Sequence, residues 1–397
     1  MDINRAWAEI DIDAIGNNIA SIRRYVSEKT KILGVVKADA YGHGYLEIAD
    51  TLLKNGADML AVACIDEAIQ LRVCGFKCPI LILGTSCEDD VNYLVKNDIT
   101  PACFSYSFAR IMSDAAVKYN KVAKIHIKID TGMGRIGYRF CEDGDANNKT
   151  VDEIMKISML PNIEIDGMFM HFSVADENDD EYTNLQFERF MNLSDTLEKK
   201  GLYIPTKHCA NSAALIRFPG MHLDMVRPGI ILYGHKPSGF VDCSELSLKP
   251  AMTFKTKITN IKTVEKGASI SYGRKFIAQR TSKIATIPVG YADGYSRGLS
   301  GRAHVIVGGK LCNLVGNICM DQCMIDVTDV NNISIGDEVI LFGKDGCAEV
   351  AVEELAEKMG TINYEILCMV GKRIPRIYIR NGEVQKVHNY LLDSPTS

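Results

Sequence analysis

Several features that mark particular classes of protein are missing from this 397-residue chain. It has no run of about 18 apolar residues, the length that a membrane-spanning helix needs. Its first residues, Met1–Arg5, lack the apolar segment of a secretory signal peptide. Lysine and arginine do not cluster and the formal net charge is -5, which argues against a nucleic-acid surface. We therefore expect a cytoplasmic protein without a membrane or nucleic-acid partner.

The thirteen cysteines lack the spacing of a metal site. Most lie in apolar contexts such as Val62-Ala63-Cys64, which is typical of reduced cysteines that fill a hydrophobic core. Two pairs are spaced four residues apart, but no second pair or histidine follows at zinc-site distance: Cys74 with Cys78, and Cys319 with Cys323. We therefore expect neither a metal nor a disulfide framework.

The length and texture of the chain predict two domains. Hydrophobic residues make up 47% and charged residues 24% of the chain, as in ordinary soluble proteins, and 397 residues exceed what one core usually serves. The pattern changes within His235–Lys249. We expect one domain over residues 1–240 and a second over residues 241–397.

Residues 1–240 alternate short β-branched apolar runs with amphipathic helical segments. Eight strands that alternate with helices predict an α/β fold, a (β/α)8 TIM-type barrel with parallel strands. A doubly wound sheet is the alternative, but no Gly-x-Gly-x-x-Gly follows an early strand. The eight predicted strands are Ile32–Val36, Met59–Ala63, Ile80–Leu83, Thr100–Cys103, Lys124–Ile129, Glu164–Met170, Pro205–His208 and Leu223–Val226.

Beyond Ser238 the long helical patterns disappear and short strands with glycine turns take over, which predicts a C-terminal β-rich domain. We expect one helix there, Val352–Met359. The predicted strands are Met252–Val264, Ser282–Val289, Ala303–Val307, Leu311–Val315, Met324–Val327, Glu338–Phe342 and Arg376–Ile379.

Polar residues close several of the predicted barrel strands, where barrel enzymes carry their active sites. Burial at a strand end lowers the pKa of a lysine and makes its amine a nucleophile able to form a Schiff base. One lysine at a strand end more commonly just reaches solvent, but four polar residues around one rim predict a site. They are Lys37, His171, His208 and Arg227, after the first, sixth, seventh and eighth strands.

The fifth predicted strand carries a second set of candidates. His126, Lys128 and Asp130 alternate with isoleucines, and a period of two places them on one face. We expect Lys128 to face the mouth of the barrel. Arg135 follows closely, and its planar guanidinium suits a carboxylate. The alternative is an internal salt bridge among Lys128, Asp130 and Arg135.

Longer segments resemble the alanine racemases, enzymes of fold type III that use pyridoxal 5′-phosphate (PLP). Val35–Gly44, Val-Val-Lys-Ala-Asp-Ala-Tyr-Gly-His-Gly, is similar to the family segment whose lysine carries the cofactor. The resemblance covers nearly the whole chain and implies a barrel followed by a β-domain, an architecture shared with basic amino acid decarboxylases. Further matching segments are Lys128–Gly137 and those around Tyr272, Tyr291, Met320 and Tyr364.

The resemblance implies a role for each candidate. Lys37 would form the Schiff base with PLP, and a carbamylated Lys128 would brace Arg135, which would bind the substrate carboxylate. An Asn-Ser pair after a strand is also a common helix cap. The other residues implied to hold the cofactor are Tyr41, His171, Asn211, Ser212, Arg227, Gly229, Ile230 and Tyr364; Tyr291 and Met320 would contact substrate, with His208 and Asp321 behind them.

The residue matched to the pyridine nitrogen, Arg227, bears on the reaction type. Arginine stays protonated and cannot pass a proton to that nitrogen, so the ring remains a weaker electron sink. This favours reprotonation at Cα, hence racemisation, whereas a decarboxylase is expected to carry glutamate there. Lys37 and Tyr272 would supply one base for each face, with His171 and then Arg227 and His208 forming a cationic neighbourhood for the tyrosine.

In the family, the residues corresponding to Tyr272, Tyr291 and Met320 reach the cofactor of the other subunit, which implies a homodimer with shared sites. The expected function is an isomerase that interconverts L-alanine and D-alanine and supplies D-alanine for peptidoglycan. A serine or broad-specificity racemase is the nearest alternative, disfavoured by the bulk of Tyr364. A PLP-binding homeostasis protein is the non-enzymatic alternative, but such proteins have a single domain.

Overall fold

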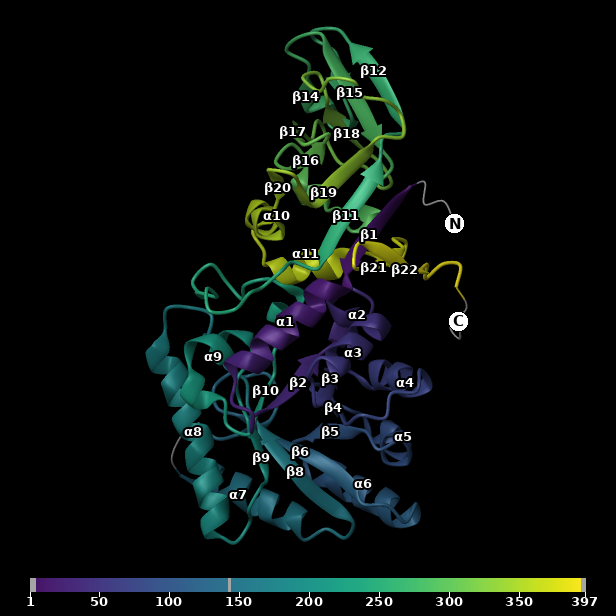
Figure 1. Cartoon of the computed structure of the whole chain (residues 1–397). Helices are drawn as coiled ribbons and strands as arrows, with labels where there is room; N and C mark the ends of the chain where they lie inside the picture. Colours follow the sequence, from purple (N-terminus) through teal and green to yellow (C-terminus); the bar gives the residue numbers. More distant parts are fainter. Residues whose placement is uncertain (1–4, 142–143, 394–397) are drawn as a thin grey trace. The chain divides into compact units, whose positions relative to one another are not determined.

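The computed structural model describes residues 5–141 and 144–393 of the chain (Figure 1). The described residues form two compact units. Residues 14–40 and 45–249 make up one, here called the barrel unit, and residues 5–13, 41–44 and 250–393 make up the other, here called the β-rich unit. The sequence-based division placed residues 1–240 together, whereas the first strand and the short segment 41–44 group with the C-terminal residues.

The barrel unit is built on eight parallel strands, each corresponding to one of the eight predicted from the sequence, so the expected barrel is confirmed. Hydrogen bonds connect the last two strands and close the sheet, from Asp224 N to Lys207 O at 3.1 Å and from Arg227 N to Ala210 O at 2.9 Å. The strand order is β10 (Met225–Val226), β2 (Lys31–Val35), β3 (Met59–Val62), β4 (Ile80–Ile82), β5 (Thr100–Cys103), β6 (Ala123–Asp130), β8 (Ile163–Phe169) and β9 (Thr206–His208), with β7 (Tyr138–Arg139) beside β6.

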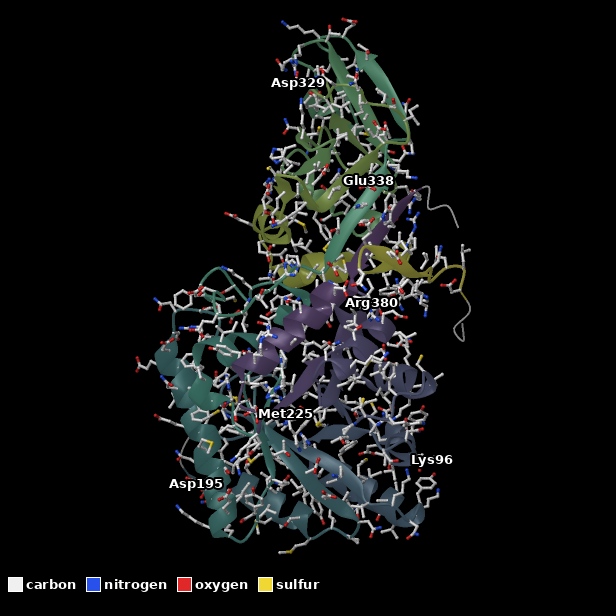
Figure 2. The ribbon with its side chains drawn as sticks, in the orientation of Figure 1. Lys96, Asp195, Met225, Asp329, Glu338 and Arg380 are labelled. Carbon is white, nitrogen blue, oxygen red and sulfur yellow. The ribbon has the colours of Figure 1, made fainter. Side chains whose placement is uncertain are left out.

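Helices surround these strands (Figure 1). In Figure 2, Met225 lies at the centre of this unit and is fully buried, whereas Lys96 and Asp195 lie on outer helices and are exposed. The helices are α1 (Ile12–Tyr25), which leads in from the β-rich unit, α3 (Tyr45–Lys54), α4 (Ile65–Val73), α5 (Val91–Lys96), α6 (Tyr106–Lys118), α7 (Asp145–Ser158), α8 (Asp180–Lys199) and α9 (Ser212–Arg217).

One glycine makes room for the polar interior of the barrel. A Cβ atom on Gly167, in β8, would lie 2.6 Å from the imidazole of His126, in β6. Real Cβ atoms do not approach that closely, so the imidazole occupies the space that any other residue at position 167 would fill. His126, Lys128 and Asp130 are all buried.

The β-rich unit centres on an eight-stranded sheet, with a three-stranded and a two-stranded sheet beside it. The helix predicted over Val352–Met359 is α10, and α11 (Asn363–Met369) follows it. The strands are β1 (Ala6–Asp11), β11 (Met252–Lys257), β16 (His304–Val307), β17 (Lys310–Asn313), β19 (Glu338–Asp345), β20 (Ala348–Val350), β21 (Arg376–Arg380) and β22 (Glu383–His388); then β12 (Asn260–Val264), β15 (Ser282–Ile287) and β18 (Cys323–Asp326); and β13 (Ser269–Ile270) with β14 (Phe276–Ile277).

The expectation of a single helix in this unit is wrong, because α11 is a second helix, and the short strands β13, β14, β20 and β22 were not predicted. Two further details also differ from the sequence-based prediction. The predicted strand Met252–Val264 is divided into β11 and β12. Between them, Ile258 N donates a hydrogen bond to Asp337 O and Thr259 N donates one to Thr286 O, so the two residues pair with different segments. Residues 6–11 form a central strand, β1, between antiparallel β11 and parallel β21. Among the described residues, no helix combines the length and apolarity needed to cross a bilayer.

Candidate active site

Lys37 lies two residues beyond the last residue of β2, Val35, and begins a turn of unusual handedness. The next residues, Ala38, Asp39, Ala40 and Tyr41, have φ angles of 53°, 54°, 53° and 53°, so the backbone runs left-handed for four residues. L-residues other than glycine lose roughly 1–2 kcal/mol each in this conformation. Strain of this kind persists only where surrounding contacts enforce it, and it is common at functional sites.

Carboxylates enforce the turn within the barrel unit. Glu67 accepts hydrogen bonds from Ala38 N at 2.6 Å and from Ala63 N at 2.7 Å, one on each oxygen. Asp39 Oδ1 accepts from Tyr45 N at 3.0 Å. These bonds fix the backbone on both sides of the turn and therefore the direction in which the partly buried Lys37 leaves it.

Arg227 is buried and anchors a chain of hydrogen bonds across the barrel interior. Its Nη1 lies 3.1 Å from His208 Nδ1, and His208 Nε2 lies 2.9 Å from His126 Nδ1. Arginine can only donate, so His208 accepts at Nδ1 and carries its proton on Nε2. His126 must then accept at Nδ1 and carry its own proton on Nε2, which lies 3.7 Å from Asp166 Oδ2. The guanidinium thus fixes the tautomer of both imidazoles.

The second terminal nitrogen of Arg227 is held as firmly as the first. Nη2 donates to Met170 O at 2.8 Å and to Cys209 O at 3.0 Å, and lies 3.3 Å from His171 Nδ1. Phe169 stacks on His208 with ring centroids 4.9 Å apart and an interplanar angle of 6°. The result is a rigid guanidinium held by two neutral imidazoles and two backbone carbonyls.

Lys128 and Asp130 do not form the internal salt bridge considered as an alternative. Lys128 Nζ donates to Ile129 O at 2.8 Å and lies 5.2 Å from the centroid of Phe169. Asp130 Oδ1 instead accepts from Gly132 N and Gly134 N, at 3.0 and 2.9 Å, and so shapes the turn that leads to Arg135. In residues 5–141 and 144–393, the exposed guanidinium of Arg135 has no ion-pair partner.

This part of the barrel unit carries an excess of positive charge. Burial, followed by the charges of Arg227 and Arg135, lowers the pKa of Lys128 to about 7. Burial also lowers the pKa of Arg227 to about 10. The pKa values of His171 and His208 lie well below the usual range, through burial and then Arg227. An anion bound here would relieve this mutual repulsion.

Two predicted phosphate contacts meet at the end of the barrel strands. Ser212 Oγ, at the start of α9, accepts a hydrogen bond from Gly229 N at 2.9 Å, just before the turn Ile230–Tyr233. Asn211 caps α9, because its side chain accepts from Ala214 N at 2.9 Å. The helix-capping role, which the sequence left open for the Asn-Ser pair, is therefore confirmed for Asn211.

The β-rich unit brings together the two predicted phosphate-binding tyrosines. The rings of Tyr41 and Tyr364 lie 5.9 Å apart between centroids, and burial followed by Tyr364 raises the pKa of Tyr41. Gly42 allows this approach, because a Cβ there would lie 2.4 Å from Leu367 O in α11, the helix that carries Tyr364.

The other three family-matched side chains of this unit are exposed: Tyr272 to 71%, Met320 to 53% and Tyr291 to 42%. Their loops are joined by hydrogen bonds. Asn317 Nδ2 donates to Tyr272 O at 2.7 Å, and Ala292 N donates to Met320 O at 3.0 Å. The structure therefore gathers Tyr272, Tyr291 and Met320 on connected loops of one unit.

Sequence analysis missed several residues that hold these candidates in place. Glu67, Asp166, Asn317 and Asp293 received no role, although each contacts a candidate or its backbone. His126, by contrast, was named from the sequence because it alternates with Lys128 and Asp130 on one strand. Among residues 5–141 and 144–393, no group of three or more His, Cys, Asp or Glu side chains is placed to hold a metal.

Comparison with known proteins identifies the architecture. The family models for the alanine racemase N-terminal and C-terminal domains match residues 10–237 and 251–378. An alanine racemase of Clostridium novyi (strain NT) is 49% identical over 386 residues, which cover 97% of this chain and 98% of that protein. The solved structure of alanine racemase from Clostridium difficile 630 has a TM-score of 0.94 at 43% identity, covering 99% of this chain and 100% of that one.

A further structural neighbour has a different name within the same fold. It is the histidine racemase from Leuconostoc mesenteroides subsp. sake, with a TM-score of 0.86 at 28% identity, covering 96% of this chain and 99% of that one. Both family models, and the relative that is 49% identical, are nevertheless alanine racemases, and together they match nearly the full length of the chain. The chain belongs to the alanine racemase family of isomerases.

Proposed function

We propose that this protein interconverts L-alanine and D-alanine with PLP as cofactor, by a two-base mechanism, and supplies D-alanine for peptidoglycan. Family membership supports the activity. The observation that carries the reaction type is Arg227, whose guanidinium is fixed by two imidazoles and two carbonyls. A permanently protonated group facing the cofactor's ring nitrogen favours return of a proton to Cα over its transfer elsewhere.

The donor set of the barrel unit fits an anionic cofactor. Its cations depress one another's pKa values, as expected of a site that receives a phosphate and a carboxylate. When bound, PLP supplies an electron sink that acidifies the Cα–H bond of an amino acid. Lys37 would carry it covalently, and Arg227 and His171 would face its ring. The phosphate would be held by Tyr41, Asn211, Ser212, Gly229, Ile230 and Tyr364.

The residues proposed to recognise the substrate are Arg135, Tyr291, Met320 and Tyr364. Arg135 is exposed and its guanidinium suits the carboxylate of an amino acid. Tyr291 and Met320 would contact the rest of the substrate. The bulk of Tyr364 favours a methyl side chain over the larger side chain of serine. Because a histidine racemase shares the fold, this choice rests on the site and not on the architecture.

The two proton-transfer roles fall to Lys37 and Tyr272. Each would hold or release a proton on one face of the substrate's Cα, at Nζ and at the phenolic oxygen respectively. Tyr272 is 71% exposed in the single chain. That exposure is what a base acting in a second subunit requires, so we propose a homodimer in which each site draws on both chains.

Lys128 fits the proposed carbamylation. A pKa of about 7 leaves much of its amine neutral near neutral pH, and the neutral amine is the form that adds to CO2. The addition of the neutral amine to CO2 forms an N–C bond, releases one proton and leaves a carbamate anion. Starting from the protonated lysine, two protons are released in all. The new negative charge would lie close to Arg135 and Arg227, whose charges lower the pKa of the free amine.

The proposal is tested with the yellow holoprotein and a chiral assay of alanine and serine, each enantiomer supplied separately. We expect L- and D-alanine to interconvert and serine to react far more slowly. Borohydride reduction followed by peptide mapping should place the cofactor on Lys37, and Lys37→Ala should lose both the visible absorbance and the activity. Label on another lysine, or no alanine turnover by the loaded protein, would contradict the proposal.

A further inference from the structure

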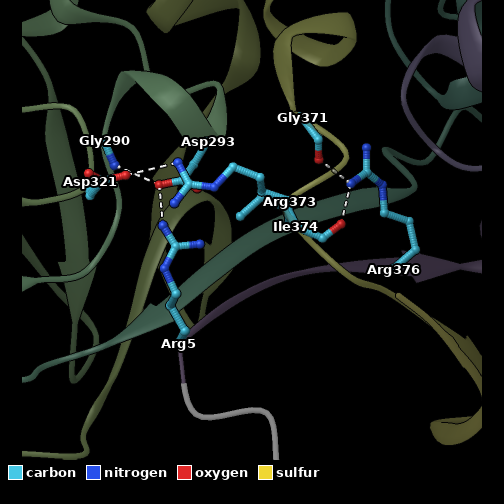
Figure 3. Close-up of polar contacts among 8 residues, drawn as sticks. All are labelled: Arg5, Gly290, Asp293, Asp321, Gly371, Arg373, Ile374 and Arg376. Carbon is cyan, nitrogen blue, oxygen red and sulfur yellow. Dashed lines mark hydrogen bonds and ion pairs between the residues drawn. The ribbon is translucent and has the colours of Figure 1, made fainter. Parts of the chain in front are cut away.

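Asp293 is a fully buried carboxylate of the β-rich unit, and Figure 3 shows its polar contacts. Arg5 Nη2 lies 2.6 Å from Asp293 Oδ2, and Gly290 N donates to the same oxygen at 3.1 Å. Arg373 Nε lies 3.7 Å from the other oxygen, Oδ1. Burying a carboxylate costs free energy unless it is paired. The ion pairs with Arg5 and Arg373 offset that cost and hold the carboxylate of Asp293 in one position.

The network extends to a second acid. Arg373 Nη1 donates to Asp321 Oδ1 at 2.8 Å, and this hydrogen bond, followed by the charge of Asp293, raises the pKa of Arg373. Two acids and two arginines, Arg5, Asp293, Asp321 and Arg373, form an electrically neutral group, here called the arginine–aspartate cluster. It joins the segment before β1 to three loops that are remote from one another in the sequence.

Backbone contacts connect the cluster to two of the exposed side chains. Tyr291 N donates to Cys319 O at 3.1 Å, and Ala292 N donates to Met320 O at 3.0 Å. Gly290 permits the approach, since a Cβ there would lie 2.2 Å from Cys319 O. Asp293 therefore sits at the end of the short helical turn whose first residue is Tyr291, and it fixes that turn against the loop of Met320.

The third side chain is linked through the same loop. Asn317 Nδ2 donates to Tyr272 O at 2.7 Å, and Ser271 Oγ donates to Asn317 O at 2.6 Å. Ser271 has a φ of 66°, a left-handed conformation that these bonds hold in place. A shift of the loop of Met320 would therefore move Tyr272 as well.

A buried arginine outside the cluster, Arg376, stabilises the loop that carries Arg373 (Figure 3). Arg376 donates to Gly371 O at 2.8 Å and to Val370 O at 2.6 Å, and also to Ile374 O. Gly371 N in turn donates to Asp293 O at 3.1 Å. The backbone around Arg373 is therefore held by bonds that do not depend on the side chain of Arg373, and it should stay in place if the cluster is broken.

We propose that Arg5, Asp293 and Arg373 are positioning residues that align Tyr272, Tyr291 and Met320 for the site of the other subunit. The inference rests on the proposed function, in which these three side chains act on the partner's cofactor and substrate. No direct contact of the cluster with either of these groups is proposed. Its effect is on the geometry of loops that its own subunit presents to the other.

The first test is Asp293→Asn in the holoenzyme. An amide keeps the shape but removes the charge that pairs with Arg5 and Arg373. We expect kcat/KM for alanine to fall about 10²-fold, as for other misplacements of roughly 1 Å, with cofactor content and visible spectrum unchanged. KM for alanine should rise as kcat falls, because contact and base residues shift together.

The matched control is Asp329→Asn, which removes an exposed ion pair with Arg280 in the same unit. Its oxygen lies 2.5 Å from Arg280 Nη2, but the two side chains are 79% and 57% exposed, and Asp329 appears at the edge of this unit in Figure 2. Exposed pairs contribute little, so this variant should match the wild type. If Asp293→Asn also stays within twofold of wild-type kcat/KM, the inference is wrong.

A second variant protects the test against a failure to fold. Arg5 is 37% exposed, so Arg5→Gln can be hydrated where Asp293 cannot. Arg5→Gln should show the same combined change in KM and kcat in weaker form, and Arg5→Lys should restore part of it by returning the charge. A loss in Arg5→Lys as large as in Arg5→Gln would contradict the role assigned to this ion pair.

Subunit mixing shows which site the cluster serves. In a mixed dimer of Asp293→Asn and Lys37→Ala, one shared site has both defects and the other has neither. About a quarter of wild-type activity should therefore return when subunits exchange at random. If Asp293 instead serves the site of its own chain, neither site of the mixed dimer is intact, and the activity of the mixture should stay near that of the two variants.

A parallel mixture separates the two proposals. Lys37→Ala mixed with Tyr272→Phe tests the shared site alone. If that mixture regains activity and the Asp293→Asn mixture does not, the role of the cluster fails and the proposed function stands. If neither regains activity although mass labelling shows exchange, the shared site itself is wrong.

Discussion

At the scale of single residues, Lys128 carries a testable link between pH and stability. Its pKa is lowered to about 7 by burial and then by Arg227 and Arg135, whereas a lysine in an unfolded chain titrates near about 10.4. Between these two pH values the unfolded chain binds more protons, so stability rises with pH across that window. Below about pH 7 the full cost of the buried ammonium is present.

Lys128→Met should therefore stabilise the cofactor-free protein most below about pH 7, by as much as about 5 kcal/mol. The advantage should shrink as the pH rises towards 10, because the wild-type lysine then folds as the neutral amine. Urea unfolding of both proteins in CO2-free buffer measures it. Lys199→Met, at the exposed end of α8, is the control and should show no such trend. A constant difference at all pH values would contradict the shift.

The candidate residues at strand ends were predictable because parallel strands deliver their last residues to one rim. His208 is the last residue of its expected strand, and Lys37 and Arg227 come just after theirs. Asp293 was not predictable, since nothing in Tyr291-Ala292-Asp293-Gly294 indicates that its carboxylate is buried beside Arg5. That pairing joins residues 288 positions apart and exists only in the folded chain.

At the scale of an element, the left-handed turn after Lys37 should respond differently in stability and in activity when its backbone strain is relieved. Ala38 is exposed and has φ 53° and ψ 50°, angles that glycine adopts freely. Ala38→Gly should raise the free energy of unfolding by up to about 1 kcal/mol, the lower end of the strain per residue. It should not raise racemase activity, because a more flexible backbone holds Lys37 less firmly.

Ala146→Gly is the matched control, since Ala146 is equally exposed but lies in the first turn of the right-handed helix α7. The same substitution should there lower stability by roughly 0.5–1 kcal/mol. Thermal or urea unfolding of both variants gives the two signs. Destabilisation by both would mean that the backbone at Ala38 is not strained.

The elements themselves were predicted unevenly. All eight barrel strands were found, because they are short, largely buried segments that alternate with amphipathic helical segments. β1 was missed, although Ala6, Trp7, Ala8 and Ile10 are buried. Both of its neighbours in the sheet, β11 and β21, lie more than 240 residues away, so no local pattern indicates that it is a strand.

At the scale of the whole molecule, the proposed dimer makes activity depend on protein concentration. Tyr272, Met320 and Tyr291 would be brought to the other subunit's site only in the assembled form. Dilution below the dissociation constant should therefore abolish racemase activity while the far-ultraviolet circular dichroism of the barrel is retained. Sedimentation at the same concentrations gives the fraction of dimer. Full activity in samples that sediment as monomers would rule out a shared site.

The position of β1 also has a consequence for how the protein is made. This strand leaves the ribosome before either of its neighbours, and one of them, β21, begins only at residue 376. At about 5–20 residues per second, the partner emerges on the order of half a minute later. The barrel has its complete sequence long before, by residue 249. We therefore expect newly synthesised chains to pass through a stage with a finished barrel and an unpaired leading strand, the stage at which a chaperone would have most to protect.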